Sequence, residues 1–296
     1  MCRFVLYLGE PLHLSSLVTA PENSLIHQSF DARERDEPLN GDGFGVAWYA
    51  PEAELDAALF RSITPAWNNQ NLRHLARVTK SRCVLAHVRA ASDGMSVSEL
   101  NTHPFVHGRY AFMHNGELAG FRRNRRGLLD RLDEEHFELV EGTTDSECLF
   151  AHTLQRLPRA RPATVEEMAD ALGGAIRDCV DYLRAHGETG ESNVNAVLAN
   201  GREAVACRFT TAVDAPAPSL HLHTGKLYSC RSGAPELVEA HEDAHSTIVA
   251  SEPLTGDASW QIVPNDHLVV IDGRRRVSMR PMPRTARSVR PGVDGT

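Results

Sequence analysis

The stretch MCRFVLYLG, residues 1–9, places a cysteine directly before a run of mainly apolar residues. A short apolar run that ends at a glycine is typical of a buried strand, and we expect a β-strand from Cys2 to Leu8. Loss of Met1 would give Cys2 a free α-amine beside its thiol. Because the ordinary pKa of an α-amine is about 8, part of it is neutral at pH 7 and can accept the thiol proton. Cys2 is therefore a candidate nucleophile, although a free cysteine is also a common core residue.

The rest of the chain predicts strands, then helices, then strands again. Residues 83–89 (CVLAHVR) and 110–116 (YAFMHNG) are short apolar runs bounded by turn residues. Two helices are expected after Thr144 and Thr164, because each threonine stands three residues before a glutamate, as in a capping box. Further short apolar runs lie within residues 193–272. This order predicts an α+β domain built from packed layers.

Composition and charge exclude several classes of protein. The 296-residue chain carries a formal net charge of -8, whereas nucleic-acid-binding proteins usually present a strongly basic face. It has neither the roughly 18–20 uninterrupted apolar residues of a membrane span nor a signal peptide at its start. Its six cysteines form no C-x-x-C pair, so we expect a reducing, cytoplasmic location and a free Cys2 thiol. We expect one domain over residues 1–281 and an irregular tail over residues 282–296.

Two charged residues stand where predicted strands or helices end or begin. Arg89 ends a strand in AHVRAAS, and its planar guanidinium can bind both oxygens of a carboxylate. Arginine at a strand end is also common on a plain surface. Asp145 in TTDSE lies in the first turn of a predicted helix, where it either complements the helix dipole or receives a substrate ammonium.

Three further polar positions complete the candidate site. In MHNGEL, the Asn115 side-chain amide and the Gly116 backbone N–H offer two donors to one point, as an oxyanion hole requires. Asn-Gly is equally a common hairpin turn. His103 in NTHPF either orders the loop that holds Arg89 or is a structural histidine. Taken together, an α-carboxylate site, an α-ammonium site, a thiol and an oxyanion hole describe a γ-glutamyl group.

The motifs MCRF, NGDGFGVAWY, AHVRAAS, NTHPF, MHNGEL and TTDSE occur in this order along the chain. This ordered set resembles the class II glutamine amidotransferases, which are N-terminal-nucleophile hydrolases. HQSFDAR, ITPAWNNQNL, TTDSECLFA and ASEPLT further resemble the stand-alone amidotransferase-type subunit of the fungal glutathione-degradation complex. The resemblance covers the chain to about Pro281.

The resemblance implies a four-layer αββα sandwich, no metal, no cofactor, and hydrolysis of a γ-glutamyl amide through a γ-glutamyl thioester that releases glutamate. It implies these roles: Cys2 as nucleophile, Arg89 and Asp145 as the sites for the glutamyl carboxylate and ammonium, Asn115 and Gly116 as the oxyanion hole, and Asp42 and Gly43 as a loop on the substrate side. The substrate that the resemblance implies is glutathione or a related γ-glutamyl compound, whose amine half is the leaving group.

Several alternatives stay open. No synthase domain is recognised in the sequence, so the chain either hydrolyses its substrate outright or supplies ammonia to a separate synthase. The fungal resemblance implies a peptidase-like partner subunit. One alternative is a γ-glutamyl hydrolase of ergothioneine-type biosynthesis, which begins with the same MCR. Another is a non-catalytic binding subunit, which would lack one of the expected catalytic residues, whereas all of them are present here. The H-E-x-x-H match at His241 to His245 would bind zinc only on a helix, and it lies in a short polar segment.

Overall fold

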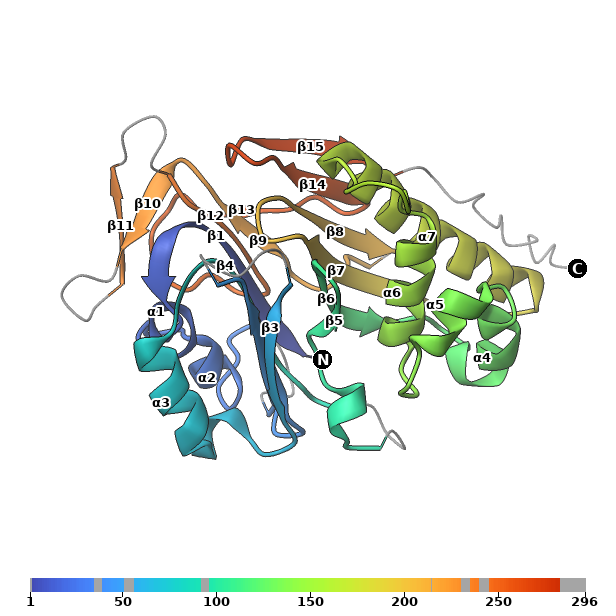
Figure 1. Cartoon of the computed structure of the whole chain (residues 1–296), viewed down its shortest axis with the longest axis horizontal. Coiled ribbons are helices and arrows are strands. Elements are labelled where there is room, and N and C mark those ends of the chain that lie inside the picture. Colours follow the sequence, from blue (N-terminus) through green and yellow to red (C-terminus); the bar gives the residue numbers. More distant parts are fainter. Residues whose placement is uncertain are drawn as a thin grey trace, which may run out of the picture.

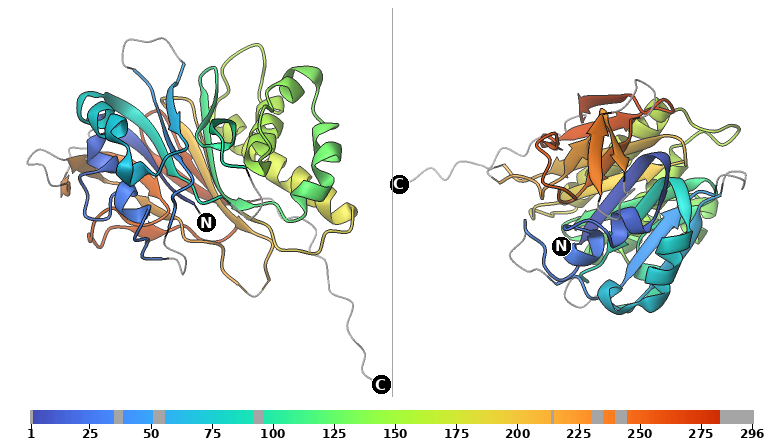
Figure 2. Two further views of the ribbon diagram at one scale, coloured as in Figure 1. Left: turned by 90° about the horizontal axis from the view of Figure 1, so that it is seen from below. Right: turned by 90° about the vertical axis from the view of Figure 1, so that its left-hand side faces the viewer.

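The chain forms two antiparallel sheets that lie face to face, with helices on the outer face of each (Figures 1 and 2). The structure is a computed structural model that describes residues 2–34, 39–50, 56–91, 96–213, 215–229, 235–239 and 245–282. Helices, sheet, sheet and helices give the four layers of the expected αββα sandwich. The α+β prediction is therefore confirmed.

The first sheet has β1 at its centre, in the order β13-β9-β12-β1-β4-β2-β3. Its strands are β1 (Arg3–His13), β2 (Phe44–Trp48), β3 (Ala58–Ser62), β4 (Lys80–Val88), β9 (His221–His223), β12 (Thr247–Ala250) and β13 (Gln261–Ile262). Arg3 pairs with Val88 in β4, and Val5 pairs with Ala250 in β12. The N-terminal strand therefore lies between two strands from distant parts of the sequence.

The second sheet has the order β15-β14-β8-β7-β6-β5. Its strands are β5 (Phe105–His107), β6 (Tyr110–Glu117), β7 (Asn193–Ala199), β8 (Ala204–Thr210), β14 (His267–Ile271) and β15 (Val277–Pro281), and a separate hairpin joins β10 (Lys226–Ser229) to β11 (Glu236–Glu239). Asn115, Asn195 and Arg208 form one row across β6, β7 and β8. This row crosses the sheet close to the candidate site.

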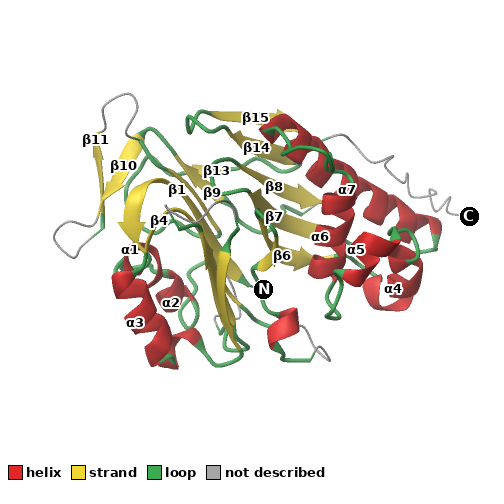
Figure 3. Cartoon of the chain, viewed as in Figure 1, coloured by secondary structure: helices red, strands yellow, loops and turns green. Residues whose placement is uncertain are grey.

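The helices cover the two outer faces (Figure 3). Beside the first sheet lie α1 (Ser15–Val18), α2 (Leu25–Gln28) and α3 (Gln70–Val78), and beside the second lie α4 (Phe121–Leu129), α5 (Glu134–Glu138), α6 (Asp145–Gln155) and α7 (Val165–Ala185), with short 3₁₀ turns at η1 (Ala66–Asn68) and η2 (Glu99–Asn101). Thr144 and Thr164 cap α6 and α7 by accepting from the backbone N–H three residues on. The expected capping box is complete at Thr164 and Glu167, whereas the Glu147 carboxylate accepts from the Glu141 and Gly142 N–H groups instead. Among the described helices, none is both long and apolar enough to cross a membrane.

Alternation along β1 explains why both of its faces are apolar. Phe4, Leu6 and Leu8 pack between the two sheets, whereas Val5 and Tyr7 pack toward the helices α1–α3. Side chains two apart share a face of a strand, so Cys2 belongs to the face that meets the second sheet. β1 continues to His13, past the predicted end at Leu8, through a bulge between Leu8 and Leu12.

Gly9 permits that continuation of β1. A Cβ atom at this position would collide with the Tyr7 hydroxyl group, which donates a hydrogen bond to the Glu10 carbonyl at 2.7 Å. The strand was expected to end before this glycine. Because glycine has no side chain, the Tyr7 hydroxyl group fits against its backbone and the strand continues through a bend.

Two buried histidines interrupt the apolar layer between the sheets. His87 of β4 stacks on His103 with ring centroids 4.3 Å apart, and His87 Nε2 lies 3.3 Å from the His114 carbonyl oxygen. Burial lowers the pKa of His87 to about 3. Burial also holds the pKa of His103 well below its ordinary value, and the positive charges of Arg89 and Arg61 add to that effect. Both rings are therefore neutral at pH 7.

The C-terminal end of the described chain packs on the second sheet. Met282 is buried and its backbone N–H donates to the Asp266 carbonyl at 2.7 Å. Residues 283–296 lie outside the described residues, so the expected boundary between a domain over 1–281 and a tail over 282–296 stays a prediction.

The core between the sheets gives the first testable prediction. Replacing the fully buried Leu85 by alanine should lower the free energy of unfolding by about 2–5 kcal/mol, because the change leaves a cavity. Leu39, which is 62% exposed, is the matched control, and its alanine variant should stay within about 0.5 kcal/mol of the parent. Urea denaturation measures both. Equal effects at the two positions would contradict the assignment of Leu85 to the core.

The buried histidines give a prediction about pH. Between about pH 6.5 and pH 3 the unfolded chain binds a proton at His87 and the folded chain does not, so the free energy of unfolding should fall as the pH drops below about 6.5. Stability measured at pH 7, 6 and 5 should therefore depend less on pH in His87→Gln than in the parent. The exposed His74→Gln should keep the parental dependence. An unchanged slope in His87→Gln would show that His87 takes up a proton in the folded state.

Candidate functional site

Cys2 lies beside the end of β4, at the point where the two sheets meet. Its Sγ atom is 3.4 Å from the Ala90 backbone nitrogen and 3.5 Å from the Ala90 carbonyl oxygen. The Ala90 N–H can therefore donate toward a negatively charged sulfur. The pairing of Arg3 with Val88 brings Cys2 next to Arg89 on the neighbouring strand. Cys2 is half-buried, so a small molecule can reach it.

The loop of Asp42 and Gly43 holds the segment that follows β4. Asp42 N–H donates to the Arg89 carbonyl at 3.0 Å, Arg89 N–H donates to the Gly43 carbonyl at 2.8 Å, and the Ala91 N–H donates to Asp42 Oδ2 at 2.8 Å. Gly43 has a φ of 117°, and a Cβ there would lie 2.8 Å from the Ser62 carbonyl oxygen. The position therefore requires glycine. The loop fixes the backbone that touches the Cys2 sulfur.

Arg89 brings a buried positive charge to the same place. Its Nη2 atom donates to the Ser96 carbonyl at 3.2 Å, while Nη1 is buried and has no hydrogen-bond partner among the described residues. Burial lowers the pKa of Arg89, and negative charge at Cys2 and Asp42 opposes that shift. A buried guanidinium with an unmatched N–H group is suited to bind an anion.

Asn115 reaches the site from the second sheet. It shares the inner face of β6 with Ala111 and Met113, and only 1% of it is exposed. Neither its amide nitrogen nor its amide oxygen has a partner within the described part of the chain. An unsatisfied buried amide costs about 1–3 kcal/mol, which is a cost that a bound ligand can remove. Gly116 follows with a φ of 147°, and a Cβ there would collide with the Asn193 carbonyl oxygen.

Asp145 begins α6 and is tied to the turn after β6. Its Oδ2 accepts from the Leu118 N–H at 2.8 Å, and its Oδ1 accepts from the Ser146 hydroxyl at 3.2 Å. Ser146 Oγ lies 2.9 Å from Nδ1 of His114, the residue before Asn115. The structure thus brings Asp145 to the end of the strand that carries Asn115.

His103 lies behind these groups and touches β4 through a ring contact. It stacks on His87, two residues before Arg89, and meets the edge of Phe105 at 4.7 Å. Its ring nitrogens have no hydrogen-bond partner among the residues that the structure describes. Its contact to the Arg89 segment therefore runs through His87, and its expected role in ordering that loop stays a prediction.

Sequence reasoning missed the role of a buried ion pair. Arg3 Nε donates to Glu252 Oε1 at 2.8 Å, and both side chains are almost fully buried. Arg3 Nη1 also donates to the Cys2 carbonyl at 3.0 Å. The sequence did carry one signal, because Arg3 is a charged residue within an apolar strand. Burying an unpaired charge is costly, so a buried Arg3 requires an acidic partner. The partner, 249 residues away, could not be identified from the sequence alone.

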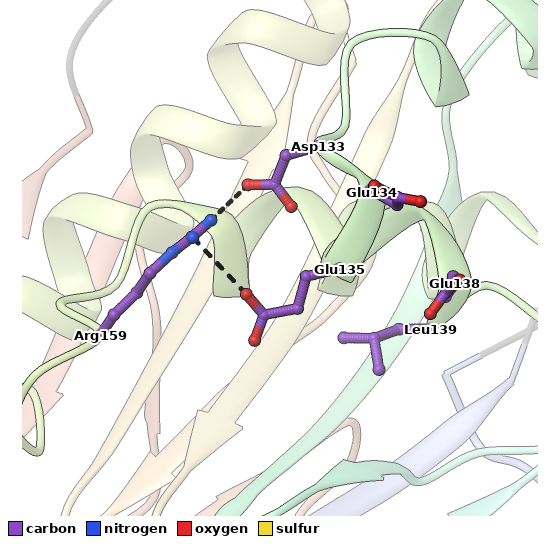
Figure 4. A pocket seen from close by; sticks show the side chains of 6 residues that line it. All are labelled: Asp133, Glu134, Glu135, Glu138, Leu139 and Arg159. Carbon is purple, nitrogen blue, oxygen red and sulfur yellow. Dashed lines mark hydrogen bonds and ion pairs between the residues drawn. The ribbon is translucent and has the colours of Figure 1, made fainter.

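Two groups with metal-ligand chemistry lie elsewhere. Asp133, Glu135 and His136 come together at the surface, but Arg159 pairs with both carboxylates (Figure 4), so each carboxylate already has a cationic partner. In the H-E-x-x-H match, residues 241–244 lie outside the described residues, and His245 Nε2 lies 3.0 Å from the Arg275 carbonyl oxygen. The expectation of no metal stays a prediction.

Known proteins match the chain over most of its length. It is 40% identical over 294 residues to the probable glutamine amidotransferase DUG3 of Saccharomyces cerevisiae, covering 92% of this chain and 82% of the yeast protein. It is 30% identical over 274 residues to the γ-glutamyl-hercynylcysteine sulfoxide hydrolase of Mycolicibacterium smegmatis, covering 91% and 95% of the two chains.

Solved structures share the architecture. A glutamine aminotransferase class-II domain protein from Silicibacter pomeroyi has a TM-score of 0.66 at 26% identity, covering 96% of this chain and all of that one. The glutamine phosphoribosylpyrophosphate amidotransferase of B. subtilis shares the fold, with a TM-score of 0.58 at 12% identity over 95% of this chain and 49% of that one.

The family model of the class II glutamine amidotransferases matches residues 15–290. This interval begins after Cys2, so the placement of Cys2 rests on the geometry described above. Together with the named relatives, the match shows that the chain belongs to the class II glutamine amidotransferase family and is an enzyme of the amidohydrolase type.

Proposed function

We propose that the chain hydrolyses a γ-glutamyl amide, with Cys2 as the nucleophile and glutamate as one product. The observation that carries this proposal is that two buried groups without partners among the described residues, Arg89 Nη1 and the Asn115 amide, lie on the segments around Cys2. Arg89 adjoins Ala90, whose N–H contacts the Cys2 sulfur, and Asn115 follows His114, whose carbonyl oxygen lies 3.3 Å from His87 Nε2 of β4. A zwitterionic glutamyl group matches the charges around the sulfur. Arg89 receives its α-carboxylate and Asp145 receives its α-ammonium.

The first half of the reaction forms a thioester. The Cys2 sulfur attacks the γ-carbonyl carbon, and the thiol proton passes to the Cys2 α-amine after Met1 has been removed. The carbonyl oxygen becomes an oxyanion, which the Asn115 side-chain amide and the Gly116 N–H stabilise. The carbon–nitrogen bond then breaks, and the proton moves from the α-ammonium to the leaving amine.

The second half returns the enzyme to its starting state. Water attacks the γ-glutamyl thioester and gives one proton to the α-amine. The carbon–sulfur bond breaks, glutamate leaves, and the sulfur regains its proton. The Asp42–Gly43 loop keeps the Ala90 backbone against the sulfur throughout, and His103 supports β4 behind Arg89.

The relatives point to compounds in which the glutamyl half is constant. We place glutathione or a similar γ-glutamyl peptide first, because HQSFDAR, ITPAWNNQNL, TTDSECLFA and ASEPLT resemble the amidotransferase-type subunit of the fungal glutathione-degradation complex. The mycobacterial relatives act on γ-glutamyl-hercynylcysteine sulfoxide, which makes an ergothioneine-type intermediate the second candidate. The third candidate substrate is glutamine, whose hydrolysis would supply ammonia to a separate synthase. We further propose that the chain works with a separate peptidase-like or synthase subunit.

A panel of substrates tests the reaction. Glutamate release should be measured from glutamine, glutathione, a γ-glutamyl dipeptide and a γ-glutamyl anilide, after intact mass has confirmed the loss of Met1. Release should disappear in Cys2→Ala, because the nucleophile is gone, and the fastest substrate identifies the leaving group. A form with residues fused permanently before Cys2 should also be inactive. Normal turnover in that fusion would exclude the α-amine as the base.

The oxyanion hole gives a second prediction. Asn115→Ala should fold normally and lose about 10²- to 10³-fold in kcat, because one donor to the oxyanion is removed. Asn68→Ala changes an exposed asparagine and should leave kcat unchanged. Stopped-time assays with the best substrate of the panel measure both variants. Parental turnover in Asn115→Ala would remove Asn115 from the mechanism.

A further inference from the structure

We infer that His114 and Ser146 are positioning residues, which orient the Asp145 carboxylate so that it can bind the α-ammonium group of the substrate. Ser146 Oγ lies 2.9 Å from His114 Nδ1, and the Ser146 hydroxyl group donates to Asp145 Oδ1 at 3.2 Å. The inference rests on the proposed function, because it explains how the proposed ammonium site is built.

His114 lies on the outer face of β6, turned away from the space between the sheets. Side chains alternate along a strand, so His114 shares a face with Phe112, which packs against the helices, and not with Met113, which packs between the sheets. Only 1% of His114 is exposed. Because Cys2 belongs to the inner layer, β6 separates it from the His114 ring. His114 therefore acts through Ser146 and is not a catalytic residue.

The hydrogen bonds fix which atoms of this network carry protons. A carboxylate has no proton to donate, so the Ser146 hydroxyl group gives its single proton to the bond with Asp145. The Ser146 oxygen then accepts from His114, whose Nδ1 atom must carry a proton. Burial lowers the pKa of His114, so the ring is neutral at pH 7 and has one proton. Nε2 is left without a proton, which agrees with its long 3.5 Å separation from the Asn193 carbonyl oxygen.

The orientation of the His114 ring decides where the Ser146 hydroxyl group points. With the ring proton on Nε2, the Nδ1 atom would accept from Ser146, and the hydroxyl group would turn away from Asp145. The ring has little room to rotate, because a Cβ atom on Gly116 would lie only 2.9 Å from His114 Nε2. The strand that carries the proposed oxyanion hole therefore also holds the ring that orients Asp145.

Asp145 receives one hydrogen bond on each carboxylate oxygen. Its Oδ2 accepts from the Leu118 N–H at 2.8 Å, and its Oδ1 accepts from Ser146 at 3.2 Å. An ionised carboxylate has about four lone-pair sites, so both oxygens keep the capacity to accept from an ammonium group. Without the Ser146 hydroxyl group, the contacts that the structure describes would hold the carboxylate at Oδ2 alone, and it could rotate away from the ammonium.

A kinetic test separates the orientation of Asp145 from the chemical step. Ser146→Ala should raise KM for a γ-glutamyl dipeptide about tenfold and keep kcat within about twofold, because the ammonium group is bound equally in the ground state and the transition state. Thr153→Val is the matched control. The Thr153 hydroxyl group is buried in the same helix and donates to the Leu149 carbonyl at 2.8 Å, so neither KM nor kcat should change. A loss confined to kcat in Ser146→Ala would overturn the inference.

Two variants that differ in one donor test His114. His114→Phe keeps an aromatic ring and removes the Nδ1–H group, so KM should rise about threefold or more. His114→Asn keeps an amide N–H group close to the position of Nδ1 and should restore most of the parental KM. Urea denaturation checks that both variants fold. Equal impairment of the two folded variants would overturn the assignment of His114 as the donor that orients Ser146.

A binding measurement makes the test independent of turnover. In a Cys2→Ala background, Ser146→Ala should weaken the binding of glutamate about tenfold and keep the binding of glutarate, which lacks the ammonium group, within about twofold. Equal losses for both ligands would assign Ser146 a purely structural role and overturn the inference, as would no loss for either. Failure of the proposed function looks different, because Asp145→Asn in the same background would then keep the parental affinity for glutamate.

Discussion

The buried ion pair between Arg3 and Glu252 is the interaction on which the rest of the site depends. Removing one partner of such a pair leaves an uncompensated buried charge, a loss of about 3–5 kcal/mol. Here the pair also ties the start of β1 to residues 33–34, because Arg3 donates to the Cys2 and Glu34 carbonyls and Glu252 accepts from the Arg33 and Glu34 N–H groups. Cys2, the proposed nucleophile, is therefore positioned by electrostatics at the start of an otherwise apolar strand, and not by its own side-chain contacts alone.

The two faces of β1 explain how the proposed nucleophile, Cys2, is held in place at the start of the strand. Chain ends usually fray because few contacts hold them. Phe4 and Leu6 pack against the second sheet while Val5 and Tyr7 pack against helices, so the strand is held from both sides up to its first residue. The polar groups of the site gather where this apolar packing stops, which places them at the edge of the inter-sheet layer and within reach of solvent.

Much of this arrangement could be predicted from particular residues. The apolar runs gave β1, β4, β6 and the strands after residue 193, and Thr144 and Thr164 gave the starts of α6 and α7. The helices α1 to α5 were not predicted, because segments of four to nine residues are too short to show a clear helical period. The positions of Arg89, Asn115 and Asp145 were expected from motifs. Glu252 was not, because its meeting with Arg3 depends on pairing between distant strands.

The pairing of β1 with β12 also sets the moment at which the enzyme becomes complete. Arg3 and Glu252 are 249 residues apart in sequence, and such distant pairings form late because loop closure must precede them. A ribosome releases Cys2 first and Glu252 almost last. During synthesis the Cys2 thiol is therefore present without its oriented backbone or its anchored loop, so the site described here can form only after Glu252 has emerged.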